Sequence, residues 1–222
     1  MPRQERLSLF LAKERTLLQT LLEGCFGFCS LVLTSHEAAL IKCPTQHQFY
    51  SSKQNLTQID VRLDYTALPF PSNYFDCIIL DHIVDVDEAL PVIFREAARI
   101  LRHDGVLLIS GFERMRWCAR LLQRQFAAKT GIKRKTYSLL DLQAQLLDLK
   151  FNTEVQHFDF CRARVLEKII GEICPFLGTG FWLIARKQVI PLKLVEEAWD
   201  FMPAIAPVNK TRPEYYLPPK QN

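Results

Sequence analysis

The chain has 222 residues, of which 49% are apolar and 23% charged, and its formal net charge is +4. These values are typical of a globular protein and exclude a disordered chain, a fibre and a strongly charged tail protein. The seven cysteines are scattered without the spacing of metal ligands, so we predict reduced thiols, no metal site and a cytoplasmic location. No apolar run reaches the roughly 20 residues that a membrane-spanning helix needs.

The apolar pattern predicts helices and strands that alternate along the chain. Residues 4–23 carry leucines and Phe10 at helical spacing, which predicts an amphipathic helix. Short apolar or alternating runs predict strands at 29–34, 47–51, 59–63, 75–80, 106–110, 151–160 and 181–185. Further helices are predicted at 36–42, from Asp85 to Leu101, at 139–149 and at 164–174.

Local signals mark where two of these helices begin and where one strand is entered. Asp85 and Glu88 have the spacing of a capping box, and Ser138 with Asp141 repeats that pattern. The tripeptide at 103–105, His-Asp-Gly, predicts a turn into the strand that follows.

The alternation of strands and helices predicts an α/β fold, with a mostly parallel sheet and helices on both faces. We expect one domain over residues 1–190, with the helix at 4–23 packed on it. Residues 191–222 contain six prolines and are predicted to form an extended tail. In sheets of this kind ligands bind at the carboxyl ends of the strands, so the residues just after each strand are the candidates for function.

Three segments resemble one enzyme family. Residues 68–80, LPFPSNYFDCIIL, resemble the LPF-x-x-x-x-FD-x-I segment of type 11 methyltransferase domains. Residues 94–109 resemble the helix, turn and strand that follow in that family, and residues 185–192 resemble an ARK-x-x-x-PL segment of its small bacterial members. These are class I enzymes dependent on S-adenosylmethionine. The resemblance implies a Rossmann-like fold, S-adenosylmethionine as cofactor and methyl transfer as activity.

The resemblance also implies where the cofactor would bind. By position, Thr34 and Ser35 form the loop after the first strand, and Asp81 follows the fourth. Asp64, followed by Tyr65, matches the family's aspartate after the third strand, a partner for the adenine amino group. A carboxylate exposed in a turn is an equally weighted interpretation of Asp64.

The cofactor half of the sequence also departs from the family. No glycine lies between positions 28 and 104, so a glycine-rich loop after the first strand is missing. Residues 51–53, Ser-Ser-Lys, stand where an acidic residue would hold the ribose hydroxyls. About seven residues join the second predicted strand to the third, too few for a helical crossover between parallel strands.

His82 is the candidate catalytic residue because it follows the fourth strand, at the edge where a methyl acceptor is expected. An imidazole with a near-neutral pKa can take a proton from an oxygen or nitrogen nucleophile. A lone histidine beside an apolar strand is more often packed and hydrogen-bonded, so both interpretations stay open.

Positive charge is concentrated in residues 113–135, which carry a net +7 against −3 for the rest of the chain. Within this stretch Arg116, Arg120 and Arg124 share one face of a predicted helix. We expect an anionic substrate or partner to contact the basic residues at 114–135. The alternative is a solvated cationic helix face.

Two classes of function are therefore compatible with the sequence. One is a methyltransferase that uses S-adenosylmethionine. The other is a methyltransferase-like scaffold that has lost the cofactor and acts by binding a partner.

Overall fold

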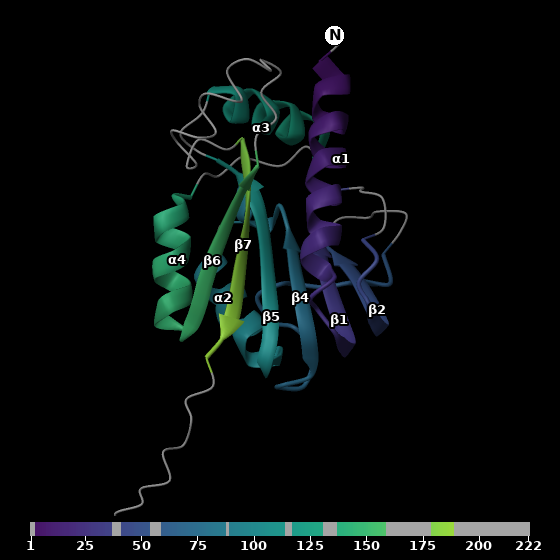
Figure 1. The fold of residues 1–222 in the computed structure, drawn as a ribbon, viewed down its shortest axis with the longest axis vertical. Coiled ribbons are helices and arrows are strands. Elements are labelled where there is room, and N and C mark those ends of the chain that lie inside the picture. Colours follow the sequence, from purple (N-terminus) through teal and green to yellow (C-terminus); the bar gives the residue numbers. More distant parts are fainter. Residues whose placement is uncertain are drawn as a thin grey trace, which may run out of the picture. The chain divides into compact units, whose positions relative to one another are not determined.

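A computed structural model describes residues 3–36, 41–53, 59–87, 89–113, 117–130, 137–158 and 179–188. The strands of these residues form one seven-stranded sheet in the order β3-β2-β1-β4-β5-β7-β6 (Figure 1). The five strands from β3 to β5 run parallel, and β7 lies antiparallel to both β5 and β6. The strands are β1 (Gly27–Thr34), β2 (Thr45–Ser52), β3 (Val61–Arg62), β4 (Phe75–Asp81), β5 (Leu101–Phe112), β6 (Phe151–Phe158) and β7 (Gly180–Lys187). The predicted α/β class is confirmed.

Among the described residues, two α-helices cover each face of the sheet. The α-helices are α1 (Arg3–Leu22), α2 (Leu90–Ile100), α3 (Trp117–Thr130) and α4 (Leu139–Asp148), and a 3₁₀ turn, η1 (Ile83–Asp85), follows β4. The alternation of side chains along β4 shows why there are two cores, because Ile78 and Leu80 pack with α2 and α4 while Ile79 packs with α1 and α3. In the ranges given above, no helix combines the length and the apolarity that crossing a bilayer requires.

Several predicted elements match the described residues closely. The helix at 4–23 and the strands at 29–34, 47–51, 75–80 and 181–185 are confirmed as α1, β1, β2, β4 and β7. The helix predicted at 139–149 is α4, although Ser138 precedes it without a side-chain cap. Residues 37–40, 159–178 and 189–222 lie outside the described residues, so the helices predicted at 36–42 and 164–174 and the tail at 191–222 stay predictions.

The predicted helix start at Asp85 is wrong. Asp85 ends η1, and α2 begins at Leu90 after Ala89, which makes no side-chain cap. The Asp85 carboxylate is not available for capping, because it accepts hydrogen bonds from His82 and from the backbone N–H of Phe112.

The predicted turn at 103–105 is also wrong, because β5 runs through it. Phe75 of β4 pairs with Leu101, and Cys77 already pairs with Val106, so a bulge absorbs the extra residues of β5. The glycine is required there, since a Cβ at Gly105 would come within 2.7 Å of the Leu101 side chain.

The short connection between β2 and β3 does not prevent a parallel pair. Only Ser51–Val61 and Ser52–Arg62 are paired, and they lie at the carboxyl end of β2. After β2 ends, the chain therefore has to go back along the strand direction by only about one residue before β3 begins. It does not have to return along the whole strand, so no crossover helix is needed.

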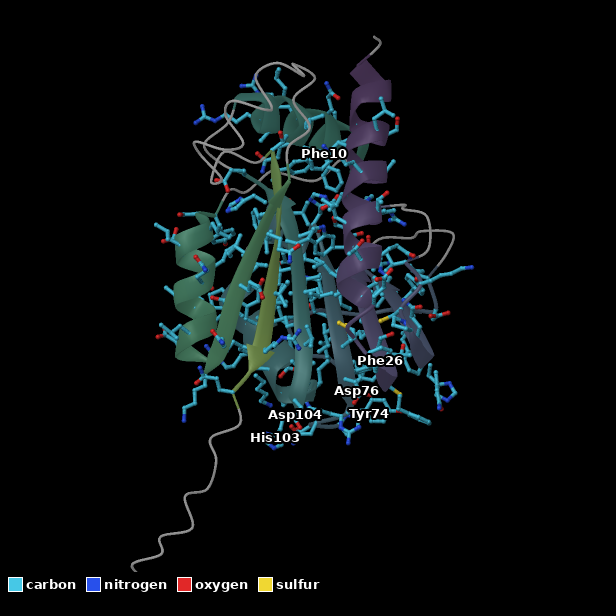
Figure 2. The ribbon with its side chains drawn as sticks, viewed as in Figure 1. Phe10, Phe26, Tyr74, Asp76, His103 and Asp104 are labelled. Atoms are coloured by element: carbon cyan, nitrogen blue, oxygen red, sulfur yellow. The ribbon has the colours of Figure 1, made fainter. Side chains whose placement is uncertain are left out.

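Asp76 ties the amino end of β4 to that of β1. Its Oδ2 accepts hydrogen bonds from the backbone N–H groups of Phe28 and Cys29 at 2.7 and 3.0 Å, and its Oδ1 accepts one from Arg102 at 2.9 Å. Burial opposes ionisation, but these donors hold the pKa of Asp76 below its usual 3.8. Figure 2 shows Asp76 near Phe26 and Tyr74 at the end where β1 and β4 begin, so its role is structural.

We predict that Asp76→Ala lowers the free energy of unfolding by about 1–3 kcal/mol, since two backbone donors lose a charged acceptor. The folded pKa of Asp76 is depressed, so its contribution is present above about pH 4 and is lost as pH falls through the folded pKa. Urea titrations at neutral and acidic pH measure this loss. Asp104→Ala, at an exposed position of β5, is the control, and equal unfolding curves for the two variants would contradict the assignment.

Candidate functional site

The carboxyl ends of β1 and β4 are joined by polar side chains. Thr34 and Asp81 are partners across the two strands, and Thr34 Oγ1 donates to Asp81 Oδ2 at 3.0 Å. Ser35 donates from its hydroxyl to the His82 carbonyl at 3.3 Å and from its backbone N–H to the Asp81 carbonyl at 3.4 Å. All four residues are buried. The hydroxyls of Thr34 and Ser35 are thus hydrogen-bonded to Asp81 and His82 at the carboxyl end of β4.

Tyr65 connects this edge to β2. Its hydroxyl donates to the Thr34 carbonyl and accepts from the backbone N–H of Lys53, both at 3.0 Å. Burial raises the pKa of Tyr65 to about 12, so the phenol remains protonated and keeps its donor. One side chain therefore holds the ends of β1 and β2 together.

A lysine with two carboxylates lies beside Tyr65. Lys53 Nζ is 2.6 Å from Asp87 Oδ2 and 3.6 Å from Asp64 Oδ1, and it lies 5.0 Å from the centre of the Tyr65 ring. The Asp64 side chain is 64% exposed. Its pKa is lowered first by the backbone N–H of Thr66 and then by Lys53, so Asp64 is an ionised acceptor open to solvent.

His82 lies at the centre of a buried ionic cluster. Its Nδ1 is 2.8 Å from Asp85 Oδ2 and its Nε2 is 3.0 Å from Glu14 Oε2, and the residue is 0% exposed. Burial favours the neutral ring, but the two carboxylates outweigh it and raise the pKa of His82 well above 6.5. His82 is thus an imidazolium that donates from both nitrogens.

The backbone of His82 adopts a left-handed conformation, with φ of 54° and ψ of 23°. Such a conformation is uncommon for a residue other than glycine and is held here by surrounding contacts. The N–H of His82 donates to Ser110 Oγ at 3.0 Å, and the ring packs against Phe112 and Phe126 with centroids 4.6 and 4.9 Å away. The imidazolium is therefore fixed in one orientation.

The carboxylates of this cluster respond differently to burial. Burial raises the pKa of Glu14, despite His82, and Glu14 Oε1 has no partner among the described residues. Burial also raises the pKa of Asp85, which nevertheless accepts from Gln123 Nε2 at 3.2 Å. For Asp81 burial is outweighed by His36 and His82, and its pKa is lowered. The cluster joins α1, η1 and α3 to the end of β4.

The structure brings together most of the predicted site residues. Thr34, Ser35, Tyr65, Asp81 and His82 form one hydrogen-bonded group, and Asp64 lies nearby across Lys53. Because both nitrogens of His82 are engaged, a role as general base would require one ion pair to open, and that role stays a prediction.

The predicted arginines are separate from this group. Arg120 and Arg124 are exposed on α3, whereas Gln123 and Phe126 of the same helix are buried in the cluster. Arg116 lies outside the described residues. In Figure 1, α3 lies at the end of the sheet toward which β4 and β5 point.

Two residues of this edge, Glu14 and Asp87, were not predicted from the sequence. Glu14 lies between Phe10 and Leu18 on the buried face of α1, and an acidic residue inside an apolar stripe was the available signal. Asp87 follows η1 with no recognisable motif, so nothing local indicated its pairing with Lys53.

Comparison with known proteins identifies the domain. Residues 24–109, which span β1 to most of β5, match the family described as a methyltransferase domain, type 11. These residues are similar to the type 11 methyltransferase family. The resemblance to this family that the sequence predicts is confirmed over residues 24–109.

The chain is also similar to individual proteins. Over 158 residues the chain is 31% identical to the uncharacterized protein YafS of Escherichia coli, covering 68% of this chain and 64% of YafS. Over 63 residues it is 41% identical to the ubiquinone/menaquinone biosynthesis C-methyltransferase UbiE of Edwardsiella ictaluri, covering 27% of this chain and 24% of UbiE. The chain therefore spans less than two thirds of the length of either relative.

Solved structures show the same fold. A methyltransferase dependent on S-adenosylmethionine from Archaeoglobus fulgidus has a TM-score of 0.57 at 14% identity, with 78% of this chain and 94% of that chain covered. A related enzyme from Mesorhizobium loti has a TM-score of 0.55 at 14% identity, with 77% and 96% covered. At such identities the likeness concerns the fold alone.

We predict that His82→Ala lowers the free energy of unfolding by about 3–5 kcal/mol, since Glu14 and Asp85 stay buried without their cation. The folded pKa of His82 is raised, so its contribution is fully present below pH 6.5 and is lost as pH rises through the folded pKa. The stability difference from wild type should therefore shrink at alkaline pH.

Denaturant unfolding over a pH series measures this difference. His103→Ala is the matched control because His103 is exposed on β5. If the two variants are equally stable at neutral pH, the ionic cluster does not hold the domain together.

Proposed function

We propose that the chain binds S-adenosylmethionine at the carboxyl ends of β1, β2 and β4 and transfers its methyl group to an acceptor. The observation that carries this proposal is the family match over residues 24–109, which coincides with the strands that build this edge. The C-methyltransferase UbiE, similar over 63 residues, supports the same class of reaction.

The residues at this edge fit the polar half of the cofactor. The adenosine part presents an amino group and two ribose hydroxyls, which require acceptors. Asp64 supplies an ionised, exposed carboxylate, and Asp87 supplies a second carboxylate beside Lys53. Asp87 is therefore proposed to serve as the ribose-binding acid, because it contacts Lys53, which stands after β2 where the family has an acidic residue.

No glycine-rich loop follows β1, but the side chains that stand there are hydrogen-bonded to neighbouring residues. Thr34 and Ser35 direct their hydroxyls onto Asp81 and the His82 carbonyl rather than outward.

A bound cofactor supplies an electrophilic methyl group on its sulfonium. Transfer of that group needs an aligned, desolvated nucleophile more than a strong base, so the chain's contribution is positioning.

Asp64→Ala is expected to weaken binding of S-adenosylmethionine by roughly tenfold or more, because a charged hydrogen-bond acceptor is lost. Isothermal titration calorimetry with S-adenosylmethionine and S-adenosylhomocysteine measures this change. Asp141→Ala, at an exposed position of α4, should leave the affinity unchanged. Absence of binding of either ligand to the wild-type chain at millimolar concentration would contradict the proposed function.

We further propose that the substrate or a partner is anionic and contacts α3. Arg120 and Arg124 are exposed on this helix, and arginine forms bidentate contacts with phosphate or carboxylate. Positive charge at this end of the sheet would raise the local concentration of an anion.

The double variant Arg120→Gln/Arg124→Gln is expected to bind anionic probes more weakly than wild type. RNA, DNA, anionic liposomes and heparin are the probes, titrated across a salt series. A nucleic-acid partner predicts a steep loss of affinity with salt and a shallower slope for the variant. If wild type and variant bind all four probes equally poorly, α3 is only a solvated cationic surface.

A further inference from the structure

Two charged side chains of α2 hold the backbone of the segment that follows β3. Glu96 and Arg99 form an ion pair, with Arg99 Nη2 2.8 Å from Glu96 Oε2 and Arg99 Nε 3.0 Å from Glu96 Oε1. Arg99 also donates from Nη2 to the Leu68 carbonyl and from Nη1 to the Phe70 carbonyl, both at 2.8 Å. Glu96 Oε2 accepts from the backbone N–H of Leu68 at 3.0 Å. Both polar groups of the Leu68 backbone are therefore bound by one ion pair.

Stabilisation of α2 alone does not account for this arrangement. A partly exposed ion pair within one helix contributes little by itself. The side chains of Arg99 and Glu96 are 35% and 21% exposed, and the two carbonyls that Arg99 binds lie 29 and 31 residues away along the chain. The planar guanidinium allows one side chain to contact two carbonyls and a carboxylate at once. The pair is thus a bridge between α2 and the segment after β3.

The segment that this bridge holds carries Asp64 and Tyr65. The backbone N–H of Ala67 donates to the Asp64 carbonyl at 3.3 Å, which closes a turn. Tyr65 ties this turn to the ends of β1 and β2 through its hydroxyl, and Leu68, which is buried, follows the turn directly. The turn is therefore fixed at one point by Tyr65 and at another by the ion pair of α2.

We propose that Glu96 and Arg99 are positioning residues for the recognition of adenine. The inference rests on the proposed function, in which the Asp64 carboxylate accepts a hydrogen bond from the adenine amino group. The Asp64 side chain is 64% exposed, so packing around the side chain does little to fix it. Hydrogen bonds weaken steeply when their geometry departs from the ideal, so the backbone that carries Asp64 has to be held still. The ion pair supplies this restraint from α2 through the backbone of Leu68.

Two ligands that differ at the adenine amino group test the proposal. S-adenosylhomocysteine carries this amino group, whereas S-inosylhomocysteine has a carbonyl oxygen in its place, which cannot donate to a carboxylate. Isothermal titration calorimetry measures both dissociation constants. We expect wild type to prefer the adenosyl ligand by roughly tenfold or more, because a charged hydrogen bond is lost with the other ligand. In Arg99→Met this preference should fall by roughly threefold or more, because Asp64 is then less well positioned.

Further variants separate positioning from stability. Arg95→Met is the matched control, because Arg95 is exposed on the same helix four residues before Arg99, and it should keep the wild-type preference. Arg99→Lys keeps a positive charge beside Glu96 without the planar fork, so its preference should lie between those of wild type and Arg99→Met. It decides the test if Arg99→Met does not fold. A role in stability alone would leave the ratio of the two affinities unchanged.

Hydrogen exchange of the Leu68 amide is a second readout that needs no ligand. We expect this amide to exchange faster in Arg99→Met than in wild type, while the amides of β4 remain protected. Unchanged exchange at Leu68 overturns the inference, as does a wild-type chain that binds both ligands and loses no preference on substitution of Arg99. If wild type binds neither ligand, the proposed function fails and the inference fails with it.

Discussion

The arrangement of the carboxyl edge depends on one buried imidazolium, His82, held between Glu14 and Asp85 at 3.0 and 2.8 Å. Removing charges from water is costly, and here the cost is offset only because both ring nitrogens donate to carboxylates. Glu14 belongs to α1, and Asp85 also binds the backbone of Phe112 and the side chain of Gln123. The cation thereby connects α1, β5 and α3 to the end of β4, and it gives this edge of the sheet a fixed geometry.

The His82 cluster also explains why the loop after β1 can have side chains where a glycine-rich loop would have none. In a glycine-rich loop the missing side chains leave room for a ligand. Here Thr34 and Ser35 have side chains, but these bond to Asp81 and the His82 carbonyl, which the cluster holds in place. In the described part of this edge, Asp64 and its lysine partner are exposed to solvent. The buried His82 cluster thus fixes the strand ends, and the exposed pair of Asp64 and Lys53 offers polar groups to a ligand.

The central strands and α1 could be predicted because buried strands appear in the sequence as apolar runs and a buried helix face as apolar residues at helical spacing. Both patterns are local. Asp85 was misassigned because its spacing from Glu88 imitates a capping box, while its carboxylate is used by His82. The pairing of His82 with Glu14 spans 68 residues and depends on how α1 crosses the sheet, which local patterns do not encode. Asp64 and Tyr65 were predicted in part. The sequence indicates them as site residues, but only the fold shows that Asp64 is exposed and that the buried Tyr65 links the ends of β1 and β2.

The protonation state of His82 is the property that most directly tests this account. Heteronuclear NMR of the ring nitrogens distinguishes an imidazolium from either neutral tautomer, and His103 serves as an exposed internal reference. The account predicts that His82 remains doubly protonated at neutral pH and above. A neutral His82 ring at neutral pH in the folded protein would contradict the claim that a buried cation organises this edge.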